Sequence, residues 1–269
     1  MSRELLIAGG GIGGLAAALA ARRAGWEARL FEQAEAFSEA GAGIQLGPNA
    51  TRILREWDLL EGGLDACVAR PECLSVREAA DGRELGRLRF ADFARRYGAP
   101  YLTAHRADLQ QVLRGAAEDA GALLVTGRRI ENVQAGDDRV CVNGGVEGDA
   151  LVGADGVFGR VRLQVIGGEL PYFTGHVAYR ALVRQDALPQ ALRSSDVTVW
   201  LGPRLHLVRY PVRAGELLNV VCLVEGRLQG DPRNWDQAAA LADLQAAMGP
   251  ACADVRDLVA AIPQWRLWA

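Results

Sequence analysis

The chain has 269 residues, half of them apolar, which is enough for one large domain or two small ones with a real hydrophobic core. A formal net charge of −3 without any charge block argues against nucleic acid or a membrane as a partner. All 30 basic residues are arginine, which excludes lysine Schiff-base chemistry. Three histidines without metal-ligand spacing argue against a metal site, and five scattered cysteines without a secretory signal predict a cytoplasmic protein with reduced thiols.

A strand, a glycine turn, a helix and a second strand follow one another from Leu5 to Glu32. The apolar run 5–8 predicts a buried strand, and glycines stand at positions 9, 10, 11, 13 and 14. Apolar residues at helical spacing predict a helix over 12–23, and the run 28–31 predicts a strand that ends in Glu32. This order is typical of the dinucleotide-binding βαβ unit.

Each residue type in the glycine turn has a mechanical reason. Gly9 permits the tight turn, Gly11 lets the backbone approach a pyrophosphate, and Gly14 lets the helix lie close on the strand. Glu32 can accept hydrogen bonds from ribose hydroxyls and would repel a 2′-phosphate, which favours FAD or NAD over NADP. The cofactor-binding residues that we predict here are Gly9, Gly11, Ile12, Gly14, Glu32 and Gln33. The alternative is a glycine-rich turn in a plain α/β domain.

A small-residue segment over 41–49 comes next. Its glycines allow close backbone approach to a flat ligand, so Gly43 and Ile44 are candidate cofactor contacts. Gln45 is a candidate to meet the substrate, and Pro48 can start a helix as its first residue. The alternative is a mobile surface loop.

Strands and one helix then follow up to a second acid–glycine pair. The run 73–90 is strand-like with a turn at Asp81-Gly82, and Arg106 precedes a helix that Gly121 ends. Short strands are predicted at 123–125, which we expect to be buried, and near 129–134, 139–142 and 150–154. The last ends at Asp155-Gly156, where ligands bind in open α/β sheets; the alternative is an ordinary turn.

From Phe173 onward β alternation replaces the helical period. Strands are predicted at 177–183, 197–201, 205–210 and 217–224, followed by helices near 235–248 and 254–262. A long antiparallel sheet after a βαβ start indicates a second lobe. The fold class is therefore mixed α/β, with a Rossmann-like βαβ domain interleaved with an antiparallel β-sheet lobe.

With these residues assembled, the chain resembles the single-component FAD-dependent aromatic hydroxylases of the salicylate hydroxylase-like and 3-hydroxybenzoate 6-hydroxylase-like kind. The resemblance rests on the glycine turn with Glu32, the segment GAGIQLGPN, Arg106 in HRADL, and Asp155-Gly156 in GADGVFGRVR. It implies that residues 1–70 and 104–170 bind FAD and that residues 71–103 and 171–269 form the substrate lobe. Arg106 would contact the pyrophosphate region of FAD. Asp155 and Gly156 would contact FAD and, transiently, the nicotinamide cofactor.

The resemblance also implies the reaction. NADH or NADPH would reduce the flavin, and a flavin C4a-hydroperoxide would hydroxylate a phenol or an aromatic carboxylic acid with oxygen as co-substrate. His206 is our candidate base and Tyr210 its partner, because residues four apart on a strand share a face. Gln45 and Arg180 are candidate substrate contacts. The alternative for His206 is an ordinary solvent-facing strand residue.

Two departures from the family pattern leave other functions open. Gly159 stands where the family has serine, and the family continues past Ala269 with a second flavin motif, so we expect an incomplete flavin site. An NAD-dependent Rossmann dehydrogenase and a non-catalytic, truncated flavin-binding remnant are therefore kept as alternatives. A small aromatic molecule and oxygen are the expected partners, and a homodimer is the assembly we consider.

Overall fold

The computed structural model describes residues 2–38, 41–227 and 230–268. The backbone divides into two compact units, a first unit of Met1–Glu39 with Leu109–Tyr172 and a second unit of Ala40–Asp108 with Phe173–Ala269. Residues 40–70 and 104–108, which we expected with the FAD-binding part, thus group with the sheet lobe. The physical reason is that Gly43–Leu46 pairs with Leu102–His105 and hydrogen-bonds to the large sheet.

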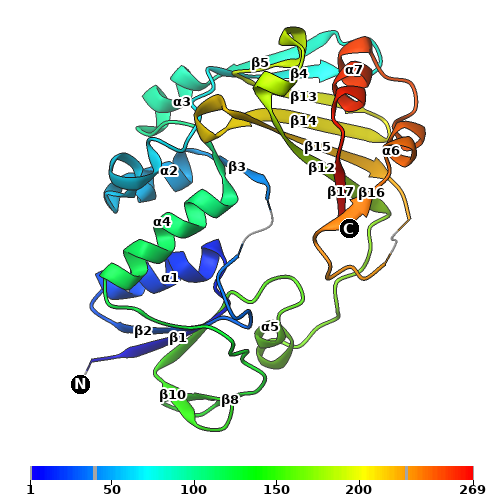
Figure 1. The fold of residues 1–269 in the computed structure, drawn as a ribbon. Coiled ribbons are helices and arrows are strands. Elements are labelled where there is room, and N and C mark those ends of the chain that lie inside the picture. Colours follow the sequence, from blue (N-terminus) through cyan, green and yellow to red (C-terminus); the bar gives the residue numbers. More distant parts are fainter. Residues whose placement is uncertain (1, 39–40, 228–229, 269) are drawn as a thin grey trace. The chain divides into compact units, whose positions relative to one another are not determined.

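The first unit is built on a four-stranded parallel sheet in the order β11-β1-β2-β7. Its helix α1 packs against β1 and β2 with Leu15, Ala18 and Leu19 buried, as the helical spacing predicts. Figure 1 shows α1 beside these strands. The elements of this sheet and helix are β1 Glu4–Ala8, α1 Ile12–Arg23, β2 Glu27–Phe31, β7 Leu123–Val125 and β11 Ala150–Gly153.

A small antiparallel sheet in the order β10-β9-β8 completes the first unit. Its Val142 is fully buried in one cluster with Leu6 and Phe31 of the parallel sheet and Val161 of α5. Helix α4 (Arg106–Asp119) begins at the unit boundary and ends before Gly121, whose φ of +85° suits the predicted helix stop. The other elements are β8 Val133–Ala135, β9 Val140–Val142, β10 Val146–Gly148 and α5 Arg160–Val165.

The second unit is built on an eight-stranded sheet in the order β16-β17-β12-β15-β14-β13-β4-β5. Neighbouring strands are antiparallel except β13 and β4, which run parallel. The strands are β4 Cys73–Glu78, β5 Glu84–Arg89, β12 His176–Arg184, β13 Val197–Gly202, β14 Leu205–Val212, β15 Leu217–Glu225, β16 Gln237–Ala239 and β17 Trp265–Trp268.

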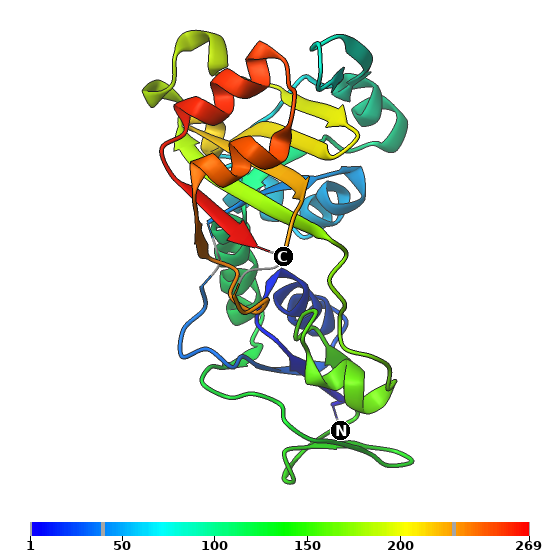
Figure 2. The same cartoon turned by 90° about the vertical axis from the view of Figure 1, so that its right-hand side faces the viewer.

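The two faces of this sheet have different coverings. On one face Leu207, Leu218 and Trp200 share a buried cluster with Leu244 of α6 (Leu241–Met248) and Leu258 of α7 (Ala253–Ala261). Figures 1 and 2 both show α6 and α7 over the sheet. Because side chains alternate along a strand, the intervening residues of β14 point to the opposite face.

Two short strands of the second unit lie against that opposite face. β3 (Gly43–Leu46) and β6 (Leu102–His105) form a two-stranded antiparallel sheet, and β14 contacts β6. The remaining helices are α2 Pro48–Glu56, α3 Phe90–Tyr97, the π-helical turn η1 Leu60–Leu64, and the 3₁₀ turns η2 Gln185–Ala187, η3 Gln190–Leu192 and η4 Arg213–Gly215.

Some sequence-based expectations were wrong at the level of single elements. The glycine-rich segment, for which a surface loop was the alternative, contains strand β3. The expected helix near 235–248 is divided into strand β16 and the shorter helix α6. Strand β17 follows Pro263 where we expected none, since its Trp265 and Leu267 bury themselves in the sheet core. The strand 123–125 is an edge strand with Leu123 exposed, not a buried one.

No helix in the described ranges is both long and apolar enough to cross a membrane. Nor do any three histidine, cysteine, aspartate or glutamate side chains of these ranges come together as a metal ligand set.

The core between the sheet and α6/α7 yields a stability prediction. Leu207 is 0% exposed in this core, so Leu207→Ala should lower the free energy of unfolding by about 2–5 kcal/mol in urea titrations. Leu88→Ala on edge strand β5 is the matched control, because Leu88 is 48% exposed and should cost about 0.5 kcal/mol or less. Equal losses for the two variants would contradict the placement of this core.

Candidate flavin and substrate sites

The glycine turn of the first unit is a place where backbone touches backbone. A Cβ on Gly14 would lie 1.8 Å from the Gly9 carbonyl oxygen, so only glycine lets α1 start this close to the end of β1. Gly9 has a φ of +100°, and a Cβ there would lie 2.4 Å from the Ala154 carbonyl oxygen after β11. The turn therefore joins the ends of β1 and β11 with no room for a side chain.

Gly11 has a different environment from Gly9 and Gly14. A Cβ on Gly11 or Gly13 would have no neighbour within 4 Å, and the φ of Gly11 is an ordinary −71°. Gly11 is the N-cap of α1 and supplies no side-chain hydrogen bond, so its first-turn N–H groups have no side-chain cap. Open space in front of such a helix start suits a phosphate group, so these residues fit the pyrophosphate of a dinucleotide.

The carboxylate of Glu32 accepts hydrogen bonds from the protein backbone and keeps acceptor positions for a ligand. Its Oε2 accepts a hydrogen bond from Gly10 N at 2.6 Å, and its Oε1 accepts one from Ala34 N at 2.8 Å. A carboxylate has about four acceptor positions, so about two remain for ribose hydroxyls. Gln110 of α4, which the sequence analysis missed, is buried and donates from Nε2 to the Gly10 carbonyl oxygen at 3.1 Å.

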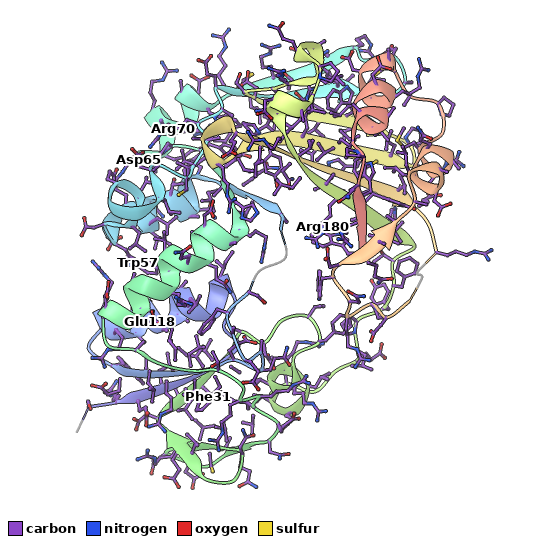
Figure 3. All side chains as sticks on the ribbon, in the orientation of Figure 1. Phe31, Trp57, Asp65, Arg70, Glu118 and Arg180 are labelled. Atoms are coloured by element: carbon purple, nitrogen blue, oxygen red, sulfur yellow. The ribbon has the colours of Figure 1, made fainter. Side chains whose placement is uncertain are left out.

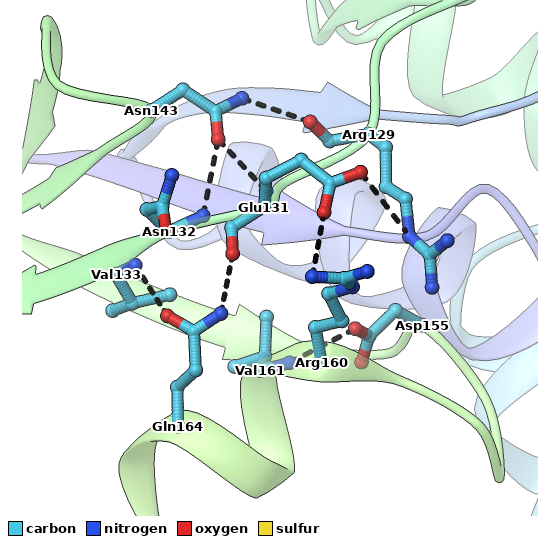
Figure 4. Close-up of polar contacts among 9 residues, drawn as sticks. All are labelled: Arg129, Glu131, Asn132, Val133, Asn143, Asp155, Arg160, Val161 and Gln164. Carbon is cyan, nitrogen blue, oxygen red and sulfur yellow. Dashed lines mark hydrogen bonds and ion pairs between the residues drawn. The ribbon is translucent and has the colours of Figure 1, made fainter.

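Asp155 is engaged with the start of α5. Its Oδ2 accepts a hydrogen bond from Val161 N at 3.1 Å, as Figure 4 shows. Gly159, the N-cap of α5, has no side chain to cap the helix, and a Cβ there would lie 2.2 Å from Asp155 Oδ1. Asp155 thus takes over the capping role while its Cα lies beside Gly9. Gly156 has a φ of +83° and open space where a Cβ would project.

A polar cluster lies on the face of the large sheet opposite α6 and α7. Tyr210 of β14 is 4% exposed, and Asn219 is its partner in the register with β15. Asn219 Oδ1 accepts a hydrogen bond from Gly43 N of β3 at 2.7 Å. The Tyr101 hydroxyl donates to Gln45 Oε1, and burial raises the pKa of Tyr101 above its usual range. Asn219 and Tyr101 were missed in the sequence analysis because no local motif marks them.

His206 shares the face of Tyr210 but not its surroundings. It is exposed near the start of β14, and partial desolvation lowers the pKa of its imidazole below the ordinary value. Four residues of strand span roughly 14 Å, so the two side chains start from well-separated points of the sheet. The structure therefore keeps His206 and Tyr210 on one face but not in contact.

Arg180 of β12, which is labelled in Figure 3, is 2% exposed. Its guanidinium donates to the Trp235 carbonyl oxygen at 2.5 Å and to Asp236 Oδ1 at 3.2 Å. It also stacks 4.9 Å from the Trp268 ring centre. Burial lowers the pKa of Arg180, while the charge of Asp236 acts in the opposite direction. Arg180 thus holds β16 and its preceding turn to the sheet.

Arg106 and the residue before it mark the start of α4. Arg106 N donates to the Ala42 carbonyl oxygen at 2.9 Å, which fixes the helix start to the segment before β3. His105 is buried, and its Nδ1 accepts a hydrogen bond from Ala107 N at 3.3 Å.

The structure thus brings the candidate residues together in two groups. The first unit gathers Gly9, Gly11, Gly14, Glu32, Asp155 and Gly156 around one turn, with Ile12 and Gln33 next to them in the chain. The second unit gathers Gly43, Gln45 and Tyr210, with Ile44 in β3 between the first two. Which of these residues touch a cofactor or a substrate stays a prediction.

The two kinds of glycine give a prediction for flavin binding. Gly11→Val should remove bound flavin and leave the fold intact, because its side chain meets only the space that suits the pyrophosphate. Gly14→Ala should instead unfold the first unit, since its Cβ cannot coexist with the Gly9 carbonyl. Flavin absorbance per protein and far-UV circular dichroism separate the two effects. Full flavin occupancy in Gly11→Val would show that the turn does not hold the phosphates.

Comparisons with known proteins identify the family of the chain. A family model described as an FAD binding domain matches residues 3–256. The chain is 37% identical to 3-hydroxybenzoate 6-hydroxylase of Polaromonas naphthalenivorans over 98% of its length and 67% of the relative. It is 34% identical to 6-hydroxynicotinate 3-monooxygenase of Bordetella bronchiseptica over 98% of its length and 70% of the relative.

A solved salicylate hydroxylase substrate complex has the same fold, with a TM-score of 0.80 at 23% identity over 100% of this chain and 68% of that one. The chain thus spans about two thirds of the length of the proteins it matches. The family match and the sequence identities confirm the resemblance, the mixed α/β fold and the FAD cofactor. The chain therefore belongs to the FAD binding domain family, among the FAD-dependent aromatic hydroxylases.

Proposed function

We propose that the protein hydroxylates a phenolic aromatic acid or a related hydroxylated ring, using NADH or NADPH and molecular oxygen. The observation that carries this proposal is the polar cluster of the second unit. There the buried Tyr210 and Asn219 and the exposed Gln45 offer hydroxyl and amide groups beside apolar side chains such as Val208 and Val212. Such a combination suits a flat ring that carries a few oxygen substituents. Relatives named for hydroxybenzoate and hydroxynicotinate support the ligand class.

Bound FAD supplies the chemistry that activates oxygen. The residues of the chain bind and orient the cofactor and the ring substrate. In the first unit the open helix start at Gly11 receives the phosphates, and Glu32 accepts ribose hydroxyls with its remaining lone pairs. Asp155 supports this turn without a direct ligand contact, because it caps α5 while its backbone lies beside Gly9. In the second unit Gly43, Ile44 and Arg106 are the candidate cofactor contacts.

The candidate catalytic residues have separate tasks. Burial raises the pKa of Tyr210 to about 12, so its hydroxyl stays protonated at neutral pH and donates a hydrogen bond. Burial lowers the pKa of His206 below its ordinary value, so its imidazole is mostly neutral, and able to accept a phenol proton, at neutral pH. Because roughly 14 Å separates their backbone positions, we assign them to different oxygens of the ligand. Arg180 is mostly occupied by Trp235 and Asp236 and supports the sheet around the ligand.

The other expectations stay predictions. They are the cytoplasmic location, the homodimer, the choice between NADH and NADPH, and the two alternative functions. A flavin-loaded protein that oxidises no NAD(P)H with any aromatic acid would favour the non-catalytic remnant. A dehydrogenase would instead reduce NAD without consuming oxygen.

The experiment that tests the function uses the flavin-loaded protein with a panel of ring acids. 3-Hydroxybenzoate, salicylate and 6-hydroxynicotinate are compared with benzoate, which has no ring hydroxyl. The proposal predicts NAD(P)H oxidation, oxygen uptake and a hydroxylated product with at least one of the hydroxylated acids and little with benzoate. NAD(P)H oxidation that is equally fast without any ring compound, and yields only hydrogen peroxide, would overturn it.

His206 provides a prediction with a pH signature. Removal of a positioned base costs about 10²–10⁴ in rate, so His206→Ala should slow hydroxylation by this order and release more hydrogen peroxide. The acid limb of the kcat/KM profile should lie below the ordinary imidazole pKa of about 6.5 in the wild type, because His206 loses its proton at lower pH than usual.

In His206→Ala that limb should disappear. Flavin content should be unchanged, because the imidazole is exposed on a strand of the second unit. A variant that keeps the wild-type rate, coupling and pH profile would reduce His206 to a surface residue.

A further inference from the structure

A hollow between strand β5 and helix α3 lies outside both groups of candidate residues. It is bordered by residues 87–89 of β5 and by Asp92, Phe93, Arg96 and Tyr97 of α3, and its volume is about 440 Å³. Pockets that hold small molecules measure roughly 300–1,000 Å³. The β5–α3 hollow is therefore large enough for a compound with one aromatic ring.

The wall that α3 contributes to the hollow is aromatic. Phe93 and Tyr97 lie four residues apart and share one face of the helix, and their rings meet edge to face with centres 5.9 Å apart. Leu88 of β5 adds an apolar side chain that is 48% exposed, and Tyr97 is 49% exposed. These three side chains together offer an apolar contact surface to a flat ring.

A series of ring contacts holds this wall in place. Phe93 meets the ring of Phe90 edge-on at 5.5 Å, and Phe90 stacks on Tyr101 at 3.9 Å with the ring planes 7° apart. Phe90 is buried in one cluster with Val197 and Val212, so the rings cannot shift without disturbing the core of the second unit. The wall is pre-organised, which lowers the entropic cost of binding a ligand.

Two arginines at the hollow have no acidic partner among the described residues. The Arg89 side chain has no hydrogen bond or ion pair there, and the charged end of Arg96 is paired only with the ring of Tyr97, 5.5 Å from its centre. Each guanidinium can bind a carboxylate through two parallel hydrogen bonds. Because like charges repel, two unpaired guanidiniums beside one hollow favour an anionic occupant.

The other charges at the hollow are already paired within the chain. Arg87 donates two hydrogen bonds to Glu84, at 2.6 and 3.2 Å, and Arg95 pairs with Asp92. Asp92 borders the hollow, so its carboxylate repels a ligand that carries several negative charges. The hollow therefore suits a ring with one negative charge better than a phosphate.

We propose that the β5–α3 hollow is an accessory binding site for an aromatic monocarboxylate. The carboxylate of the ligand pairs with Arg89 and Arg96. Its ring lies against Leu88, Phe93 and Tyr97. The ligand class is that of the ring acids considered above, but the hollow shares no residue with the candidate flavin and substrate groups, so the site does not depend on the proposed function.

Protein NMR tests this site without any turnover. The flavin-loaded protein, labelled with nitrogen-15, is titrated with benzoate, and the backbone amide signals of α3 and β5 are followed. The proposal predicts that these signals shift in a saturable manner. Acetate, which lacks the ring, should bind at least about threefold more weakly at the same signals. Inorganic phosphate should also bind more weakly than benzoate, because Asp92 repels its additional charge.

Variants of exposed residues separate the contacts of the ligand. Arg89→Gln and Arg96→Gln should each weaken benzoate binding about tenfold, as expected for the loss of one charge-assisted contact. Tyr97→Leu should weaken benzoate binding about threefold and leave acetate binding unchanged. Arg83→Gln is the matched control, because Arg83 is an exposed arginine that pairs with Asp81 and does not border the hollow. It changes the net charge equally and should leave benzoate binding unchanged.

Three results would overturn the proposal. They are unshifted α3 signals in the presence of benzoate, equal affinity for acetate and benzoate, and an equal loss of affinity in Arg83→Gln and Arg89→Gln. The outcome is separate from that of the proposed function. A protein that binds benzoate at α3 but hydroxylates no ring acid would contradict the proposed function alone, and ring hydroxylation without a shift at α3 would contradict the accessory site alone.

Discussion

The contact between the Gly9 carbonyl and the start of α1 is the constraint on which the first unit depends. Because a Cβ on Gly14 would lie 1.8 Å from that carbonyl oxygen, the helix can begin here only on glycine. The close approach leaves the N-terminus of α1 uncapped and open at Gly11, which is the feature that suits a phosphate. Glu32 and Gln110 then hold the Gly10 peptide from both sides, through its N–H and its carbonyl. The backbone segment that closes the turn is therefore also the predicted phosphate site.

The second unit is organised around a sheet whose two faces carry different side chains. One face is largely apolar and packs on α6 and α7, which supplies stability. The other face carries Tyr210 and Asn219 under strand β3, where each polar group has to be satisfied locally. The Oδ1 of Asn219 accepts a hydrogen bond from Gly43 N, whereas its Nδ2 has no hydrogen-bond partner in the part of the chain that the structure describes. Stability from one face thus permits an energetically costly arrangement on the other.

The sequence predicted those parts whose signal is local. The β1–α1–β2 order followed from periodicity and glycine spacing, and its ends were within one residue of the observed ones. β3 was missed because glycine has no strand propensity, although Ile44 and Leu46 alternate. Asn219 and Gln110 carry no local pattern, since their partners lie 176 and 100 positions away. The capping role of Asp155 was hidden for the same kind of reason: it depends on where α5 starts.

The central claim, oxygen transfer to an aromatic ring, is tested most directly by isotope labelling. The flavin-loaded protein is supplied with NAD(P)H, a hydroxylated ring acid and oxygen-18 gas. The mass of the product is then measured by mass spectrometry. Our account predicts a ring product that has gained one oxygen atom, and that atom comes from the gas. A product whose new oxygen derives from water, or NAD(P)H oxidation that forms hydrogen peroxide with an unchanged ring, would contradict it.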